Sequence, residues 1–283
     1  MEEKINTSSV VPDLHMHSVF SDGNYTPEEL AEMAAKNGVN FVSLTDHDEI
    51  EGNERMKKAC EAKNIAFVPG VEISSNYAGK EIHVVGLNID TSNKELIQAL
   101  KTTKENRGKR AEEMAAKLEE TGFPNALEGA MKFVTNPSLI SRIHFAKWLA
   151  DIKAVNSIDA AFEKYIGSGR ACFVPLNAPT IPEAVRLIKG AGGIPVLAHP
   201  GRYGFKDWKL HALLDEFRNA GGEAIEVTTG SHSAKDNTMM CQIAADQGFI
   251  ASTGSDFHRL GTRCPIGAQG KIPSNLIPVW TLF

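Results

Sequence analysis

Cysteine is scarce in this sequence, and the few cysteines that occur are scattered. The 283 residues include four of them, and no two form a CxxC pair: Cys60, Cys172, Cys241 and Cys264. This distribution argues against a disulfide framework and against a zinc site built from cysteine. We therefore expect free thiols, as in a reducing cytoplasm.

The sequence also lacks long apolar runs and a basic leader. No apolar stretch reaches the length that a membrane-spanning helix needs. The start, MEEKINTSSVVP, does not have the basic-then-apolar pattern of a secretory signal. Together these absences predict a cytoplasmic protein that makes no membrane contact.

Positive charge is not in excess, because the formal net charge is -5. The electrostatics of the whole chain therefore favour neither nucleic acid nor anionic membranes, and an anionic substrate would need local attraction. Hydrophobic residues make up 42% of the chain, so a large core can form. The length suits one large α/β barrel or two ordinary domains.

Short apolar segments alternate with amphipathic helical stretches over much of the chain. Capping boxes at residues 26–29 and 180–183 mark two helix starts. Alternation of this kind predicts an α/β fold with parallel strands. Seven units favour a closed or nearly closed barrel, with a doubly wound open sheet as the alternative. The expected strands are residues 10–15, 41–45, 65–73, 81–89, 194–200, 223–228 and 249–258.

The alternation is interrupted between residues 93 and 178. A long charged helical stretch runs to about residue 120, and shorter helical pieces follow without a strand of the earlier type. We expect residues 1–92 and 179–283 to form the barrel domain and residues 93–178 to form an inserted helical subdomain that covers substrate.

Histidines gather at the predicted strands. In DLHMHSVFSDG, residues 13–23, His15 and His17 lie two apart and face the same side of an extended chain. Taken alone, this pair could be a packed structural feature or a metal site. Six of the nine histidines lie in or at the end of predicted strands: His15, His17, His47, His83, His199 and His258.

Carboxylates follow the same distribution, at Asp22, Asp46, Glu72 and Asp256. The carboxyl ends of barrel strands meet on one face, which is where barrel enzymes build active sites. A cluster of six imidazoles and four carboxylates is hard to satisfy internally, whereas two or three divalent ions satisfy it directly. The ligand types suit zinc, manganese or iron.

An ordered series of motifs resembles the PHP (polymerase and histidinol phosphatase) family of metal-dependent phosphoesterases. The motifs are DLHMHSVFSDG, SLTDHDEIEG, FVPGVEIS, EIHVVG, VLAHPGRY and TGSDFH. The resemblance implies a distorted seven-stranded (βα) barrel with an inserted helical subdomain. Segments such as KYIGSGRACFVP are similar to a bacterial branch of 3′,5′-nucleoside bisphosphate phosphatases, also described as 5′-to-3′ exoribonucleases.

The resemblance implies three divalent ions, which we expect to be manganese, with iron or zinc as alternatives. Glu72 bridges the first two sites, and Asp46 is expected to orient a ligand from outside. The implied ligands are His15, His17, Glu72 and Asp256 for the first ion, Glu72, His83 and His199 for the second, and Asp22, His47 and His258 for the third.

The expected reaction cleaves the 3′-phosphate ester of a 5′-phosphorylated nucleotide or RNA end by attack of a hydroxide that the ions generate. His199 or His258 is a candidate proton donor to the leaving oxygen, with metal-bound water as the alternative. Arginine binds phosphate in pairs of hydrogen bonds, so five arginines are candidates for the 5′-phosphate. They are Arg107, Arg110, Arg142, Arg170 and Arg202. For Arg107 and Arg110, a solvated helix face is the alternative.

Three other interpretations stay open at this point. The chain could be a different phosphomonoesterase, such as a histidinol phosphatase, or an amidohydrolase-type barrel, which also begins with HxH. It could also be a non-catalytic PHP module, although every implied ligand position holds a suitable residue. No obligate protein partner is evident from the sequence.

Overall fold

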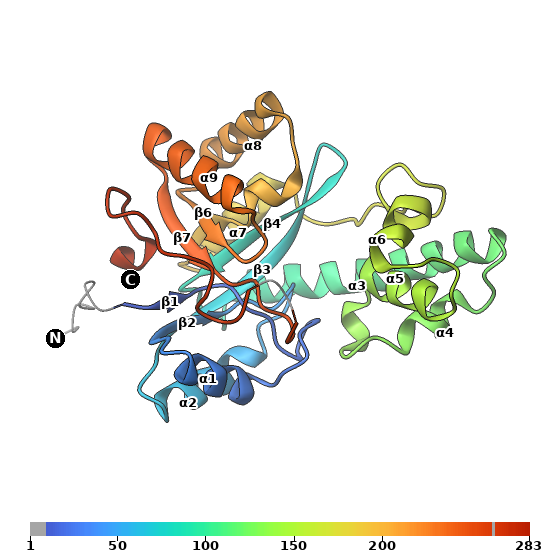
Figure 1. Ribbon diagram of the computed structural model, residues 1–283, viewed down its shortest axis with the longest axis horizontal. Helices are drawn as coiled ribbons and strands as arrows, with labels where there is room; N and C mark the ends of the chain where they lie inside the picture. The colour runs from blue at the N-terminus through green and yellow to red at the C-terminus, as the bar shows by residue number, and fades with distance from the viewer. Residues whose placement is uncertain (1–9, 262–263) are drawn as a thin grey trace.

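A computed structural model describes residues 10–261 and 264–283. Figure 1 shows an α/β body, which contains all the strands, and a helical lobe to one side, connected by a long helix. No helix in the described part of the chain is long and apolar enough to cross a membrane. Most of the segment on which the prediction of no secretory signal rests, residues 1–9, lies outside the described residues.

In the described part of the chain, seven strands form one sheet in the order of the sequence, and the sheet curves into a nearly closed barrel. The barrel closes where the chain after β1 meets the chain after β7, through a bridge between Met16 and Phe257. The predicted fold class is therefore confirmed. The strands are β1 Pro12–Asp13, β2 Phe41–Leu44, β3 Ala66–Tyr77, β4 Lys80–Leu87, β5 Ile194–Leu197, β6 Ala224–Thr229 and β7 Ile250–Gly254.

The expectation that all strands are parallel is wrong for β4, which runs antiparallel to both β3 and β5. The two residues between β3 and β4, Ala78 and Gly79, both have positive φ. Such a two-residue turn makes a hairpin, and a hairpin joins antiparallel strands. The start of β4 consequently lies at the same end of the barrel as the carboxyl ends of the parallel strands.

The first strand is shorter than predicted, because only Pro12 and Asp13 pair with β2. The chain beyond it is held from both sides by individual hydrogen bonds. The Leu14 amide donates to the Thr253 carbonyl, and the Thr45 amide donates to the Met16 carbonyl. His15 and His17 thus lie on an extended segment between β2 and β7, although regular pairing has ended.

Helices cover the barrel on two sides, with α1 and α2 on one side and α7, α8 and α9 on the other (Figure 1). Both predicted capping boxes form, with Thr26 and Glu29 at α1 and with Thr180 and Glu183 at α7. These helices are α1 Pro27–Lys36, α2 Gly52–Glu61, α7 Ile181–Gly190, α8 Asp207–Asn219 and α9 Ala234–Gln247. Two short 3₁₀ turns are η4 Pro200–Tyr203 and η5 Val279–Leu282.

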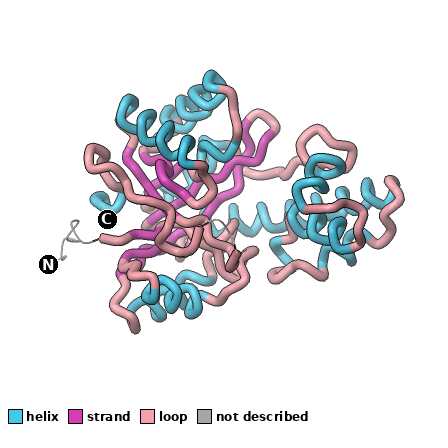
Figure 2. The backbone as a smooth tube through the Cα atoms, viewed as in Figure 1, coloured by secondary structure: helices cyan, strands magenta, loops and turns pink. Residues whose placement is uncertain are grey.

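Residues 93–178 contain helices and loops and no strand, as Figure 2 shows. The long helix α3 leaves the barrel and enters the lobe, where a separate hydrophobic cluster includes Met114, Phe145 and Trp148. The domain boundaries remain a prediction. The elements are α3 Lys94–Glu120, α4 Ala126–Met131, η2 Pro137–Leu139, α5 Arg142–Asp151, α6 Ile158–Ala161 and the π-helical turn η3 Phe162–Ile166.

Replacement of Gly129 by alanine tests the packing of the lobe. A Cβ atom at Gly129 would lie 2.1 Å from Trp148 Nε1, closer than two such atoms can approach. We expect Gly129→Ala to lower the free energy of unfolding by about 1–3 kcal/mol, because an overpacked core must distort. Denaturant unfolding monitored by circular dichroism measures this change.

Gly108 in α3 provides the matched control, because a Cβ atom there meets nothing within 4 Å. Gly108→Ala should raise the stability by up to about 1 kcal/mol, since alanine is the better helix former. Equal unfolding free energies for the two variants would contradict the packing described for the lobe.

Candidate metal centre

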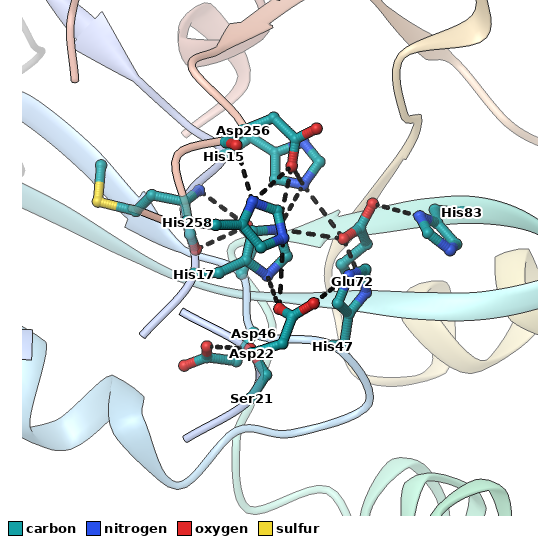
Figure 3. Close-up of polar contacts among 12 residues, drawn as sticks. His15, His17, Ser21, Asp22, Asp46, His47, Glu72, His83, Asp256 and His258 are labelled. Carbon is teal, nitrogen blue, oxygen red and sulfur yellow. Dashed lines mark hydrogen bonds and ion pairs between the residues drawn. The ribbon is translucent and has the colours of Figure 1, made fainter. Parts of the chain in front are cut away.

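Nine side chains from six strands and their following loops meet at one end of the barrel. Figure 3 shows eight of them around a common centre, and His199 joins them by contact with Glu72. The structure therefore brings together all nine predicted ligand positions. They are His15, His17 and Asp22 after β1, His47 after β2, Glu72 in β3, His83 in β4, His199 after β5, and Asp256 and His258 after β7.

Glu72 is the centre of the cluster and is fully buried. Its Oε2 atom lies 3.2 Å from His15 Nε2, 3.3 Å from His17 Nε2 and 2.9 Å from His47 Nδ1. Its Oε1 atom lies 2.9 Å from His83 Nδ1 and 3.1 Å from His199 Nε2. One carboxylate thus contacts five imidazoles, which is the geometry expected of a bridging ligand.

The other two carboxylates extend the cluster on either side of Glu72. Asp256 Oδ1 lies 3.3 Å from His17 Nε2 and 3.7 Å from His15 Nε2. Asp22 Oδ1 lies 3.3 Å from His258 Nε2, and Asp22 Oδ2 lies 4.0 Å from His47 Nε2. Each carboxylate therefore contacts a different set of histidines in the same cluster. We call the cluster of nine ligand candidates the cup.

Among residues 10–261 and 264–283, four groups of side chains have donor atoms close enough to share an ion. One contains the predicted third set, Asp22, His47 and His258, together with His17, and another contains three residues of the predicted first set, His15, His17 and Asp256. The predicted second set is divided here, because His83 groups with His47 and Glu72, whereas His199 groups with His15 and Glu72. The assignment of ligands to individual ions stays a prediction.

The donor atoms fit metal ions better than they fit one another. Nδ1 of His17, His47, His83 and His199, Oδ1 of Asp22 and Oε2 of Glu72 are buried and make no hydrogen bond of acceptable geometry, although His47 Nδ1 and Glu72 Oε2 are only 2.9 Å apart. His15 Nε2 and His17 Nε2 lie 3.1 Å apart. Buried polar atoms without partners are costly, and divalent ions would satisfy this set because imidazole and carboxylate are their usual ligands.

Charge and burial oppose each other throughout the cup. Burial alone would raise the pKa of the Glu72 carboxyl, but the imidazoles of His47, His83 and His15 hold it well below its usual value. Burial alone would lower the pKa of His17, yet its contacts with Asp256 and Glu72 raise it to about 10. Without ions, His15, His17 and His83 therefore hold their protons more tightly than a free imidazole, whereas burial lowers the pKa of His47 and His199.

Glu226 in β6 supports the cup from behind, and it is not among the residues predicted from the sequence. Its Oε1 accepts a hydrogen bond from His15 Nδ1 at 2.7 Å, and its Oε2 accepts one from the His199 amide at 2.7 Å. The first bond fixes the proton on Nδ1 and leaves His15 Nε2 free for an ion. The signal was a lone carboxylate within the otherwise apolar run AIEV, residues 224–227.

Asp46, predicted to orient a ligand, supports the loop that carries two of them. Its carboxylate accepts hydrogen bonds from the Ser18 amide at 2.7 Å and from the hydroxyls of Ser18 and Ser21 at 2.6 and 2.5 Å. Ser18 follows His17, and Ser21 precedes Asp22. Asp46 therefore fixes the backbone from which these two side chains project.

Backbone strain accompanies the site. His199 and Asp256 have φ values of 33° and 53°, in the left-handed region that residues other than glycine rarely adopt. Both residues lie two positions beyond the end of a strand, β5 or β7, and at these positions the unusual backbone turns their side chains into the cup. Strain of this kind persists where surrounding contacts enforce it, and it is common at functional sites.

The five candidate arginines lie in three different settings. Arg107 is buried, and its guanidinium donates to Asp48 at 2.8 and 3.0 Å. Arg110 and Arg142 both donate to Glu81 Oε2, at 3.1 and 3.2 Å. The remaining two, Arg202 and Arg170, are exposed; Arg202 pairs with the ligand candidate Asp256 at 3.2 Å.

A small cleft of about 130 Å³ connects three of these arginines with the cup. Asp22 and His47 line it on the side of the cup, Arg107 and Arg110 line it from α3, Arg142 from α5, and Glu81 from β4. An anion placed there would lie near three guanidinium groups and the candidate ion ligands together.

Comparisons with known proteins agree with this geometry. The model of the PHP domain matches residues 13–148. The chain is 39% identical to a 3′,5′-nucleoside bisphosphate phosphatase of Chromobacterium violaceum, over 95% of this chain and 94% of that protein. It is 36% identical to a 5′-3′ exoribonuclease of Haemophilus influenzae, over 96% of this chain and 98% of that protein.

Two solved structures of related sequence have a fold similar to that of this chain. An amidohydrolase from Chromobacterium violaceum, solved with bound sulfate and no metal, superposes with a TM-score of 0.90 at 38% identity, covering 96% of this chain and 95% of that one. A Bifidobacterium adolescentis protein, described as a metal-dependent phosphoesterase, has a TM-score of 0.78 at 27% identity and covers 96% and 93%.

Replacement of Glu226 by glutamine tests its support of His15. Glutamine keeps the shape, but it has one acceptor oxygen for two donors and no charge. We expect the affinity for divalent ions to fall by about 10- to 100-fold, as is usual when the partner of a ligand imidazole is removed. Elemental analysis of the protein after dialysis against limiting manganese measures the occupancy.

Glu223→Gln is the matched control, because Glu223 is exposed and precedes the same strand. It should leave the metal content unchanged. If Glu226→Gln also retained full metal occupancy, the role given to Glu226 would be wrong.

Metal binding should depend on pH. The pKa of His17 is raised to about 10 and that of His83 to about 9, so both imidazoles carry two protons at neutral pH in the metal-free protein. An ion must displace one proton from each, so affinity should rise between about pH 6.5 and about pH 8.5, with proton release. Competition with a chelating dye, calibrated at each pH, measures the affinity. Equal affinities at the two pH values would contradict the protonation of His17 and His83 in the metal-free protein.

Proposed function

The chain belongs to the PHP-domain family, and we propose that it is a metal-dependent phosphoesterase acting on 5′-phosphorylated nucleotides. The proposed reaction hydrolyses the 3′-phosphate ester. It converts a 3′,5′-nucleoside bisphosphate to a 5′-monophosphate and phosphate, and it releases 5′-mononucleotides from the 5′ end of RNA. Both substrates present the same 3′-oxygen–phosphorus bond beside a 5′-phosphate, so one site serves both.

One observation carries this proposal, namely that a cup of nine candidate ion ligands opens onto a cleft lined by three arginines. The cup suits the ester that is cleaved, and the arginines suit a second, uncleaved phosphate. A phosphomonoesterase for substrates with a single phosphate would not need the second feature. The names of the two curated relatives support the same substrate class.

We propose three divalent ions held by the nine ligands, with manganese as the expected metal and iron or zinc as alternatives. Such ions supply positive charge and acidify water, which hydrolysis of a phosphate ester needs at neutral pH. Three carboxylates, Asp22, Glu72 and Asp256, offset about half of the charge that three divalent ions bring, so an anionic ester is attracted locally despite the net charge of -5 of the chain.

The 5′-phosphate is proposed to bind at Arg110 and Arg142. In the structure both donate to Glu81 Oε2, so this carboxylate oxygen holds the position in which we propose that a phosphate oxygen binds. Glu81 keeps the two guanidinium groups oriented when no substrate is bound, and a phosphate can then share or replace its hydrogen bonds. Arg107 supports them indirectly, because its bonds to Asp48 fix α3 against the barrel.

Proton transfer to the leaving 3′-oxygen falls to His258 or His199. His258 is the more accessible, with a side chain that is 25% exposed against 2% for His199. Burial lowers the pKa of His199 to about 4, which makes it a weak proton source at neutral pH. His258 is therefore the better placed of the two, but its Nδ1 already donates to the Asp256 carbonyl at 2.9 Å and its Nε2 is a candidate ion ligand, so a water held by the ions would be the alternative proton donor.

The test is hydrolysis of adenosine 3′,5′-bisphosphate by the manganese-loaded protein, with identification of the product. Adenosine 5′-monophosphate is the expected product. Adenosine 3′-monophosphate, which lacks the 5′-phosphate, should be a poor substrate. Formation of adenosine 3′-monophosphate from the bisphosphate would reverse the proposed orientation, and no release with confirmed metal content would reject the proposed activity.

Arg142→Ala should reduce the preference for the bisphosphate over adenosine 3′-monophosphate by about 10-fold or more, because a charge-assisted hydrogen bond is worth about 1.5–3 kcal/mol. The loss should appear mainly in KM for the bisphosphate. Arg170→Ala, which removes an exposed arginine of the same lobe, is the matched control and should leave the ratio unchanged. An unchanged ratio for Arg142→Ala would place the 5′-phosphate elsewhere.

A further inference from the structure

A strip of alternating cationic and aromatic side chains leads away from the cup. Residues 202–209 read RYGFKDWK, with three cations and three aromatic rings in eight residues. The segment runs through η4 into the first turn of α8. Lys80, on the β3–β4 hairpin, joins it in space, because its ammonium donates to the Tyr203 carbonyl.

The strip begins at the candidate ion ligands. Arg202 pairs with Asp256, and the Tyr203 ring lies 5.4 Å from the His199 ring. The Tyr203 hydroxyl also accepts a hydrogen bond from the His83 amide at 2.8 Å. A chain that leaves the cup on this side would therefore meet the strip first.

Cations and rings contact each other farther along the strip. The Lys80 ammonium lies 5.0 Å from the centre of the Phe205 ring, and the Lys209 ammonium lies 4.6 Å from it. Burial, and then the charges of Lys209, Arg142 and Arg202, lower the pKa of Lys80. Three of these four cations, Lys80, Arg202 and Lys209, belong to the strip, and such a concentration of positive charge in a chain of negative net charge suits a polyanion.

Trp208 adds an exposed ring to this surface. Its exposed fraction is 70%, whereas Trp148 and Trp280 are 6% and 7% exposed. A tryptophan ring in solvent gains nothing for the fold, yet it provides a flat face on which a base of any identity can stack. Cations that follow a phosphate backbone, together with rings that stack on bases, are typical of single-strand binding.

We propose that the RNA strip, comprising residues 202–209 and Lys80, binds the part of a single-stranded RNA that lies 3′ of the scissile phosphate. This inference rests on the proposed function and extends it, because it makes RNA rather than a free bisphosphate the substrate that uses the whole surface. A nucleoside bisphosphate ends at its 3′-phosphate in the cup, whereas a longer chain can extend from the cup along residues 202–209 towards Trp208.

Kinetics with substrates of two lengths test the proposal. For Trp208→Ala, KM for a 5′-phosphorylated oligoadenylate should rise by about 5- to 100-fold, the value of one base–aromatic stack. KM for adenosine 3′,5′-bisphosphate should change less than about twofold. Trp208→Phe should restore most of the RNA affinity, because phenylalanine still offers a ring face. Ile277→Ala removes another exposed apolar side chain and is the control.

Fluorescence provides a second readout that needs neither metal nor catalysis. Because the other two tryptophans are buried, quenching by added oligoadenylate in the metal-free protein reports on Trp208. We expect quenching that disappears in Trp208→Phe and weakens with salt. Lys206→Gln and Lys209→Gln should each reduce that salt dependence, by about 0.7 in the slope of log K against log salt for each phosphate that the lysine neutralises.

The outcomes separate this inference from the proposed function. Quenching by the oligonucleotide supports the strip even if adenosine 3′,5′-bisphosphate is not hydrolysed, in which case the proposed activity fails alone. Hydrolysis of the bisphosphate with no quenching, and with equal RNA kinetics in Trp208→Ala and wild type, overturns the strip alone. Quenching by anionic lipid vesicles but not by RNA also overturns it.

Discussion

The contact of one buried carboxylate with five imidazoles is the interaction around which the site is built. Glu72 is fully buried on β3, and five histidines from four other parts of the chain lie within 3.3 Å of its oxygens. Such a group is unstable without compensation, because desolvated charges and unpaired lone pairs are costly. The surrounding structure supplies that compensation in two ways, through protons or ions inside the cup and through fixed hydrogen bonds around it. Glu226 behind His15 and Asp46 behind the loop of His17 are the clearest examples of the second way.

The barrel brings the residues of the cup together from distant parts of the chain. The ligands come from both ends of the chain, and curvature of the sheet brings β1 and β7 together, so that His17 and Asp256 meet at 3.3 Å. The reversal of β4 contributes as well, because it places His83, near the start of its strand, beside residues that end or follow the others. Left-handed backbone at His199 and Asp256 then aims these two side chains inward, where a regular strand end would not.

Much of this arrangement could be predicted from the sequence. The rest could not, because it depends on contacts between residues far apart in the chain. The HxH motif, the histidines at strand ends and the capping boxes at Thr26 and Thr180 are local signals, and each is found as expected. Glu226 gave only a weak signal, because its partners lie 211 and 27 residues away and only packing brings them together. The pairing of Arg107 with Asp48 was hidden for the same reason, so sequence alone did not separate it from Arg110, three residues later.

Helix α3 explains why two arginines so close in sequence have different surroundings. Leu96 and Leu100, near its start, pack in the core of the barrel, whereas Ala111 and Met114 pack in the core of the lobe. The buried stretch between the two cores contains Arg107 and Arg110, at the level of the cleft. Because one rigid helix belongs to both cores, the lobe cannot move relative to the barrel without moving Arg110 relative to the cup. The helix itself therefore sets the distance between the proposed 5′-phosphate position and the ion ligands, and under the proposed function this fixed distance would select ligands with two phosphates at a matching separation.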